Sequence, residues 1–122
     1  METVNGNRIF NTTPHEIRFM ESDGTIVIVP KGKVSDSVKA NSTETLVSTS
    51  GKTMFVTPKF TPDDESLQVI EKAYNDGADI VVGSIIAAQA YPGKVFGMVP
   101  VEGYERATND QKIMKSDTFV TY

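Results

Sequence analysis

The only histidine of the chain lies in a dense cluster of hydrogen-bonding residues that runs from Asn11 to His15. An amide, two hydroxyls and an imidazole occur there together, at Asn11, Thr12, Thr13 and His15. These groups supply the donors and acceptors that recognise the edge of a base or the hydroxyls of a sugar. The same residues also favour a purely structural turn, in which Asn11 holds the bend and His15 pins a neighbouring loop. The pattern therefore predicts either a ligand-binding turn or a bend of the backbone.

A second candidate site lies at Val82-Gly83-Ser84, where an apolar strand runs through a tight turn into a short helix. Backbone amides at such a junction are free to bind an anion such as phosphate. The alternative is that Gly83 only permits the turn and Ser84 only caps the helix. The segment is not a P-loop, and Ile86 stands where the nucleophile elbow of hydrolases has its second glycine.

Aromatic and basic residues of the C-terminal third could complete a nucleotide site. Tyr91, Phe96 and Tyr104 could stack on a base, with Phe96 expected in the core and Tyr104 on the surface. Positive charge for a phosphate is available from Lys94, Arg106 and Lys112.

Catalytic chemistry has less support in the sequence. One histidine among many serines gives no spacing that indicates a nucleophilic triad. The acids Asp63, Asp64 and Glu65 fit the first turn of a helix better than a metal site, so no metal and no cofactor are expected. The remaining enzymatic alternative is a small hydrolase that uses His15 as a general base.

The elements that must position these residues can be read from local patterns. Alternating apolar residues at 17–20 and 25–29 around Ser22-Asp23-Gly24 predict an N-terminal hairpin. Thr61 as cap and Pro62 in the first turn predict an amphipathic helix that ends at Gly77. Residues 80–82 read as a strand buried on both faces and residues 85–90 as a short buried helix. Further strands are predicted at 8–10, 53–59, 95–101 and 118–122, and residues 35–50 read as an edge strand or a mobile loop.

The predicted fold class is therefore α/β of the α+β kind: a small mixed β-sheet or partly closed barrel in a single globular domain, 1–122. A length of 122 residues, no cysteine and a net charge of −4 fit such a domain in a reducing cytoplasm. The acidic charge disfavours bulk nucleic acid, and no apolar run is long enough to cross a membrane. A small phosphorylated ligand stays compatible with this charge because it needs only a few local donors.

Two motifs give the chain a resemblance to a family of small proteins from phages and bacteria. Asn11-Thr-Thr-Pro-His15 is similar to the Asn-Leu-Thr-Pro-His with which these proteins open, with Thr12 in place of leucine. The second motif matches at Ser84, Ala87, Gln89, Ala90 and Gly93, whereas the closing Gly-Cys-Arg-like segment of many relatives is absent. The resemblance implies a viral context. By analogy with small phage proteins of this size, it also implies counter-defence by an oligomeric sponge for cyclic nucleotide signals.

These observations lead to one preferred expectation and two alternatives. The preferred one is a cytoplasmic homo-oligomer that sequesters a small cyclic nucleotide without cleaving it. The predicted ligand-binding residues are Asn11, Thr12, Thr13, His15, Gly83, Ser84, Gln89, Tyr104 and Arg106. The alternatives are a structural or protein-interaction module of a phage and the hydrolase that uses His15.

Overall fold

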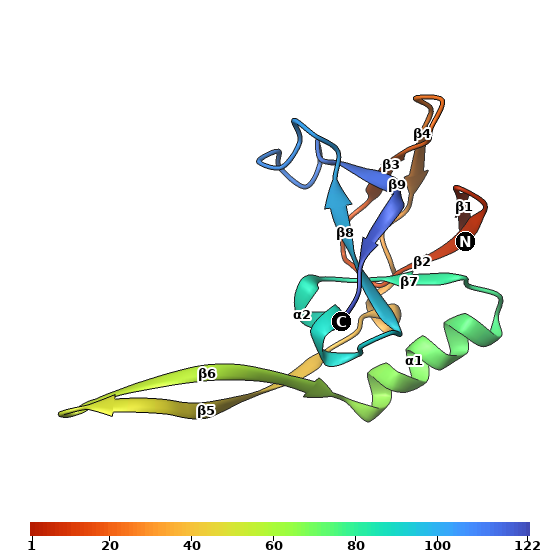
Figure 1. The fold of residues 1–122 in the computed structure, drawn as a ribbon. Helices are drawn as coiled ribbons and strands as arrows, with labels where there is room; N and C mark the ends of the chain where they lie inside the picture. The colour runs from red at the N-terminus through yellow and green to blue at the C-terminus, as the bar shows by residue number, and fades with distance from the viewer.

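The computed structural model describes residues 1–122 and shows a mixed α+β fold built on one strongly curled sheet (Figure 1). Seven strands form this sheet in the order β1-β2-β7-β8-β9-β3-β4. The elements are β1 (Glu2–Val4), β2 (Asn7–Asn11), β3 (Ile17–Met20), β4 (Ile26–Val29), a 3₁₀ turn (Val34–Asp36), β5 (Ala40–Ser50), β6 (Thr53–Pro62), α1 (Asp64–Asn75), β7 (Ile80–Val82), α2 (Ile85–Ala90), β8 (Val95–Pro100) and β9 (Ile113–Val120).

The sheet is a nearly closed barrel with a single seam. Strands β2, β7 and β8 are parallel neighbours, β9 and β3 are parallel, and the other neighbouring pairs are antiparallel. Its two edge strands, β1 and β4, approach each other without pairing. Across this seam the Asn5 amide donates to the Glu21 carboxylate at 2.9 Å. The predicted class, a partly closed barrel with two helices, is confirmed.

Two apolar clusters lie on opposite sides of the barrel wall. Inside the barrel, Phe19 packs with the other buried residues Val4, Ile9, Ile17, Val29 and Val82. Outside it, the helices cover β7 and β8 through Ile70, Ala73, Ala78, Val81, Ala87, Ala90, Tyr91 and Val95. The neighbours Val81 and Val82 belong to different clusters because successive strand residues point to opposite faces. Strand β7 is therefore buried on both faces, as its apolar run predicts.

Several predicted elements are confirmed with shifted bounds. The hairpin is β3 and β4, with Ile17 and Phe19 buried and their neighbours partly exposed. Helix α1 ends at Asn75, and Gly77, predicted as the terminal left-handed residue, follows two residues later with a φ of 104°. Its cap, however, is Asp63 and not Thr61: the Asp63 carboxylate accepts from the amides of Glu65 and Ser66.

The N- and C-terminal strands differ from the expectation. Strand β1 lies in the stretch that reads as a polar start, and it buries Val4 completely. Strand β9 begins at Ile113, five residues earlier than predicted, because its N-terminal part pairs with β3. Strand β1 pairs with its neighbour β2 across a tight turn, whereas β9 depends on β3, a partner distant in the sequence that no local pattern indicates.

The largest difference is at residues 40–62. The polar stretch that reads as an edge strand or loop is an 11-residue strand, β5, which pairs with β6 in a separate two-stranded sheet. This hairpin projects from the barrel as an arm (Figure 1). Neither helix of the structure has the length and apolar character that a membrane-spanning helix requires.

Candidate functional site

Asn11 holds the bend between β2 and β3 with every polar atom of its side chain. Its amide nitrogen donates to the carbonyls of His15 at 2.8 Å and Pro30 at 2.9 Å. Its amide oxygen accepts from the Thr13 amide at 2.9 Å and the Thr13 hydroxyl at 2.7 Å. Because Asn11 is also buried, its side chain orders the turn and presents His15 to the surface.

The two sequence motifs meet in space. The Thr12 amide and hydroxyl both donate to the Val82 carbonyl, at 3.1 and 2.9 Å. Gly83 follows directly, and a Cβ on it would lie 3.0 Å from the Thr12 hydroxyl and 2.9 Å from Val95 Cγ1. Only glycine therefore allows the strand to pass this close to the first motif.

The amides at the start of α2 are partly engaged already. The Gly83 amide donates to the Phe96 carbonyl at 3.0 Å, and Ser84 Oγ accepts from the Ala87 amide at 3.1 Å. Ser84 thus caps a helix of six residues. Next to it the exposed side chains are those of Ile85 and Ile86, so the surface at this helix end is apolar.

A polar cleft opens beside the bend, with a cavity volume of about 440 Å³. It is lined by the segment 14–18 and by residues of the loop between β8 and β9, namely Pro14, His15, Glu16, Arg18, Asn109 and Asp110. His15 is exposed, and its Nε2 lies 3.4 Å from the Asn109 side-chain nitrogen. The bend and the loop, 94 residues apart in sequence, therefore form one site.

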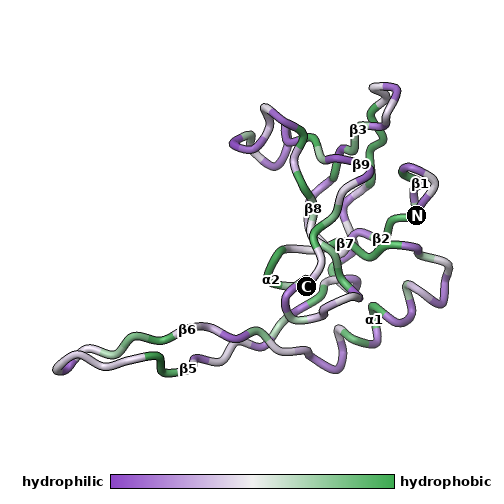
Figure 2. Tube along the Cα trace, in the orientation of Figure 1, coloured by the Kyte–Doolittle hydropathy of each residue, from purple (hydrophilic) through white to green (hydrophobic).

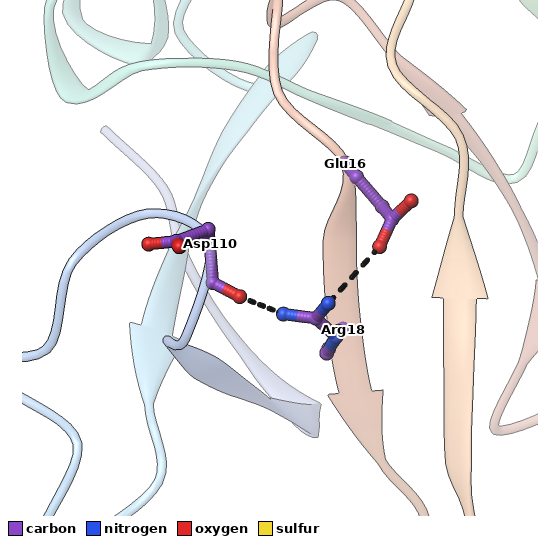
Figure 3. A network of polar contacts seen from close by, with 3 residues as sticks. All are labelled: Glu16, Arg18 and Asp110. Carbon is purple, nitrogen blue, oxygen red and sulfur yellow. Dashed lines mark hydrogen bonds and ion pairs between the residues drawn. The ribbon is translucent and has the colours of Figure 1, made fainter.

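Arg18 joins the two sides of this cleft (Figure 3). Its Nη2 lies 3.3 Å from Glu16 Oε1, and its Nη1 donates to the Asp110 carbonyl. The Arg18 side chain keeps an exposed fraction of 34%. The pKa of Asp110 is lowered, chiefly because the Thr108 hydroxyl donates to its carboxylate. Asp110 therefore stays ionised, and Arg18 is held by Glu16 and a carbonyl.

A smaller hollow continues the cleft toward the barrel. It shares His15, Glu16 and Asn109 with the cleft and adds Thr13 and Lys112 at its rim, above Ile17, Met98 and Met114. Two methionines give an adaptable apolar floor, which accommodates flat or irregular groups. We refer to the two adjoining hollows together as the His15 cleft.

The predicted ligand-binding residues fall into three groups. Thr13 and His15 line the His15 cleft. Asn11, Thr12 and Gly83 lie behind it and support the bend. Outside the lining are Ser84, Gln89, Tyr104 and Arg106, and their role as ligand contacts stays a prediction.

Other residues have different positions from those the sequence suggests. Tyr91 is buried and cannot stack on a ligand; its hydroxyl bonds to the backbone of Lys39 and Asp63. Arg18 and Asn109 also belong to the site, but no sequence motif predicts them. The signal in the sequence for Asn109 is its polar turn in a long loop, which places it at the surface but not beside His15.

Comparisons with known proteins identify no relative for this chain. No protein-family model matches it. No curated protein and no solved structure matches it either.

Proposed function

We propose that this protein binds a small anionic, nucleotide-like ligand in the His15 cleft and holds it without cleaving it. The observation that carries the proposal is the composition of the cleft. The larger hollow holds the donors Arg18 and Asn109, and the adjoining smaller hollow holds Lys112 above Met98 and Met114. Ligand sites pair an apolar surface with a few convergent polar groups in this way.

The size of the larger hollow fits such a ligand. Its volume of about 440 Å³ lies within the range of roughly 300–1,000 Å³ that small-molecule sites occupy. Two basic residues of the cleft, Arg18 and Lys112, lie beside the carboxylates of Glu16 and Asp110, so an anion would be held by local donors and not by net charge. A guanidinium binds phosphate with two parallel hydrogen bonds. Arg18 is one-third exposed and held only by Glu16 and a carbonyl, so a phosphate can share it from the open side. His15 and Asn109 supply a hydrogen-bonding edge for a base or sugar.

The lining offers no activated side-chain nucleophile, so hydrolysis in this cleft would need a water activated by His15. The one hydroxyl on the lining belongs to Thr13, and it donates to the Asn11 side chain and lies near the His15 carbonyl. A nucleophile needs an adjacent base that can take its proton, and this hydroxyl faces a carbonyl and an amide oxygen instead. The counter-defence role in a host cytoplasm, the phage origin and the homo-oligomeric state are parts of the same proposal.

A ligand panel tests the proposal. The probes are cyclic AMP, cyclic di-AMP, cyclic di-GMP and their linear counterparts, scored by thermal shift and isothermal titration calorimetry. A probe present at a hundredfold excess over its dissociation constant stabilises the fold by about 2.7 kcal/mol. The proposal fails if no probe raises the melting temperature.

Two substitutions separate the cleft from other surfaces. Arg18→Met should weaken binding at least tenfold, whereas Arg8→Met is the matched control because Arg8 is exposed and lies outside the lining. Equal loss in both variants would place the site elsewhere. After heat release, intact ligand supports sequestration. Cleaved product, abolished by His15→Ala, would establish the hydrolase instead.

A second candidate function, a protein-interaction module, is favoured by a different observation. The arm formed by β5 and β6 leaves large apolar side chains uncovered far from the cleft. These exposed side chains offer a surface for another protein chain and are independent of any ligand in the cleft.

A further inference from the structure

The arm, residues 40–62, has two chemically different faces. Paired residues of antiparallel strands lie on the same face, and successive residues alternate between faces. The pairs Leu46↔Val56 and Thr49↔Met54 therefore share one face, and Thr45↔Thr57 lies on the other. The first face, which we call the apolar face, carries seven apolar residues, Ala40, Leu46, Met54, Val56, Pro58, Phe60 and Pro62, together with Ser42, Glu44 and Thr49. The opposite face is mostly polar, with Phe55 as its exposed apolar residue.

The apolar face is covered only at its base. Ala40 and Phe60 pack against the helix-side cluster of the body, where α2 contacts both strands. Farther out, Leu46, Met54 and Val56 are between 46% and 70% exposed. Figure 2 shows these apolar stretches on the part of the arm that stands clear of the body. The apolar face is packed against the body at its base and exposed to solvent farther out, which indicates that another surface covers its outer part.

A free arm of this kind is costly to keep exposed. An isolated two-stranded hairpin is only marginally stable in water and needs a third layer on its apolar side. A contiguous apolar surface of this sort marks an interaction site. The elements of this chain that pack on the arm reach only its base, so the outer layer must come from another molecule.

The surface area of the whole chain supports the same conclusion. The accessible area is 7779 Å² for a mass of 13.3 kDa. A compact monomer of this mass exposes about 6,450 Å² by the usual scaling, so the excess is about 1,300 Å². A stable interface takes about 800 Å² from each partner. The excess area alone is enough for an interface of standard size.

The chain itself offers a surface that complements the arm. Ile85 and Ile86 at the start of α2 form a second exposed apolar patch. Of the charged residues of the arm, Glu44 lies on the apolar face, paired with Pro58, and Lys59 lies on the opposite face. The outer part of the apolar face, at Leu46, Met54 and Val56, carries no charge and therefore matches an apolar patch.

We infer that two copies of this chain exchange arms: the apolar face of each arm covers the Ile85–Ile86 patch of the other copy. A twofold pair makes this contact twice and closes the assembly. The inference goes beyond ligand binding and does not depend on it, because no residue of the arm lines the His15 cleft.

Solution mass is the first test. Sedimentation equilibrium of the full chain should give twice the 13.3 kDa of one copy. Val56→Asp places a charge on the apolar face and should weaken the dimer at least tenfold. Thr57→Asp is the matched control, since it is the next residue, is also exposed, and lies on the opposite face. A monomeric wild-type chain, or equal weakening by both substitutions, overturns the inference.

Disulfide trapping identifies the contact without destabilising the arm. The chain has no cysteine, so single cysteines report unambiguously. A mixture of Val56→Cys and Ile86→Cys chains should form a mixed disulfide dimer on mild oxidation, and neither variant alone should do so efficiently. Trapping in the Val56→Cys sample alone would show arm against arm and overturn the assignment to α2. No trapping in any sample, with the dimer present, would also overturn it.

Discussion

The hydroxyl of Tyr91 ties both strands of the arm to the body, and its removal should loosen the arm specifically. It donates to the Lys39 carbonyl at 2.6 Å and accepts from the Asp63 amide at 2.8 Å. Lys39 immediately precedes β5 and Asp63 immediately follows β6. One buried oxygen thus closes the base of the hairpin from both sides.

Tyr91→Phe keeps the buried ring and removes only this oxygen. Each lost hydrogen bond costs about 1 kcal/mol net, and the partly buried donor and acceptor left behind add to this, for about 2–3 kcal/mol in total. The shift in melting temperature is this free-energy loss divided by the unfolding entropy, which is about 2.1 cal/mol/K for each residue. For this chain the melting temperature should therefore fall by roughly 8–12 °C. The Asp63 amide should also lose protection from hydrogen exchange.

Tyr74→Phe is the matched control for this substitution. Its hydroxyl also donates to a carbonyl, that of Lys94, but the bond is exposed. Water replaces such a bond readily, so the loss should be about 0.5–1 kcal/mol. Both variants are to be compared at one protein concentration, because association shifts melting. A fall for Tyr91→Phe no larger than that for Tyr74→Phe would refute the reasoning.

Three further predictions concern the bend and the loop. Asn11→Asp should destabilise by about 2–4 kcal/mol in urea unfolding, because a carboxylate oxygen replaces the nitrogen that donates to two carbonyls. Gly83→Ala should cost about 1–3 kcal/mol by the same assay, since the added Cβ lies 2.9 Å from Val95 Cγ1. Thr108→Val should raise the lowered pKa of Asp110 toward its ordinary range, as followed by NMR titration. A carboxyl group whose pKa is lowered by folding stabilises the folded state at pH values above its ordinary pKa, and this stabilisation is lost as the pH falls through the folded-state pKa. The difference in free energy of unfolding between the wild-type chain and Thr108→Val should therefore disappear in acid.

The elements that could be predicted are those whose signals are local. The hairpin of β3 and β4 combines strict alternation with a Ser22-Asp23-Gly24 turn. Helix α1 has acids in its first turn and Gly77 just beyond its end. Strand β7 is a run of apolar residues bounded by a polar turn and a glycine. In each case neighbours in the sequence decide the structure, so no long-range information is needed.

The arm could be predicted only in part: the strand expected at 53–59 is confirmed as β6, whereas the residues of β5 carry two conflicting signals. Serine, threonine and asparagine dominate β5, as in loops, and its alternation is interrupted by a bulge between Leu46 and Ser48. The apolar face of the arm can be recognised only when the register between β5 and β6 is known. The pairing of Ser42 with Phe60 or Leu46 with Val56 is a property of two strands together.

The candidate site was predicted only in part for a similar reason. The residue types of the Asn11–His15 turn indicate its hydrogen-bonding capacity, and they also indicate the alternative of a backbone bend held by Asn11. The partners of the turn lie far along the chain: Asn109 is 94 residues from His15, and Asp110 is 92 from Arg18. Only the parallel pairing of β3 with β9 brings the loop that precedes β9 beside the bend.

The closed base of the arm bears directly on how two copies can associate. Tyr91 caps the C-terminal end of α2, and its hydroxyl holds both strands of the arm. Helix α2 also carries Ile85 and Ile86 and contacts both strands of the arm, so the Tyr91 hydroxyl fixes the base of the arm beside the patch that receives its counterpart. A base that is held in place leaves less backbone to order on association, and preorganised surfaces bind more tightly for the same area. A loosened base should therefore weaken the dimer even though Tyr91 lies outside the proposed interface. We therefore expect Tyr91→Phe to lower the dimer affinity more than Tyr74→Phe does. An equal effect of the two substitutions would show that the Tyr91 hydroxyl has no role in assembly.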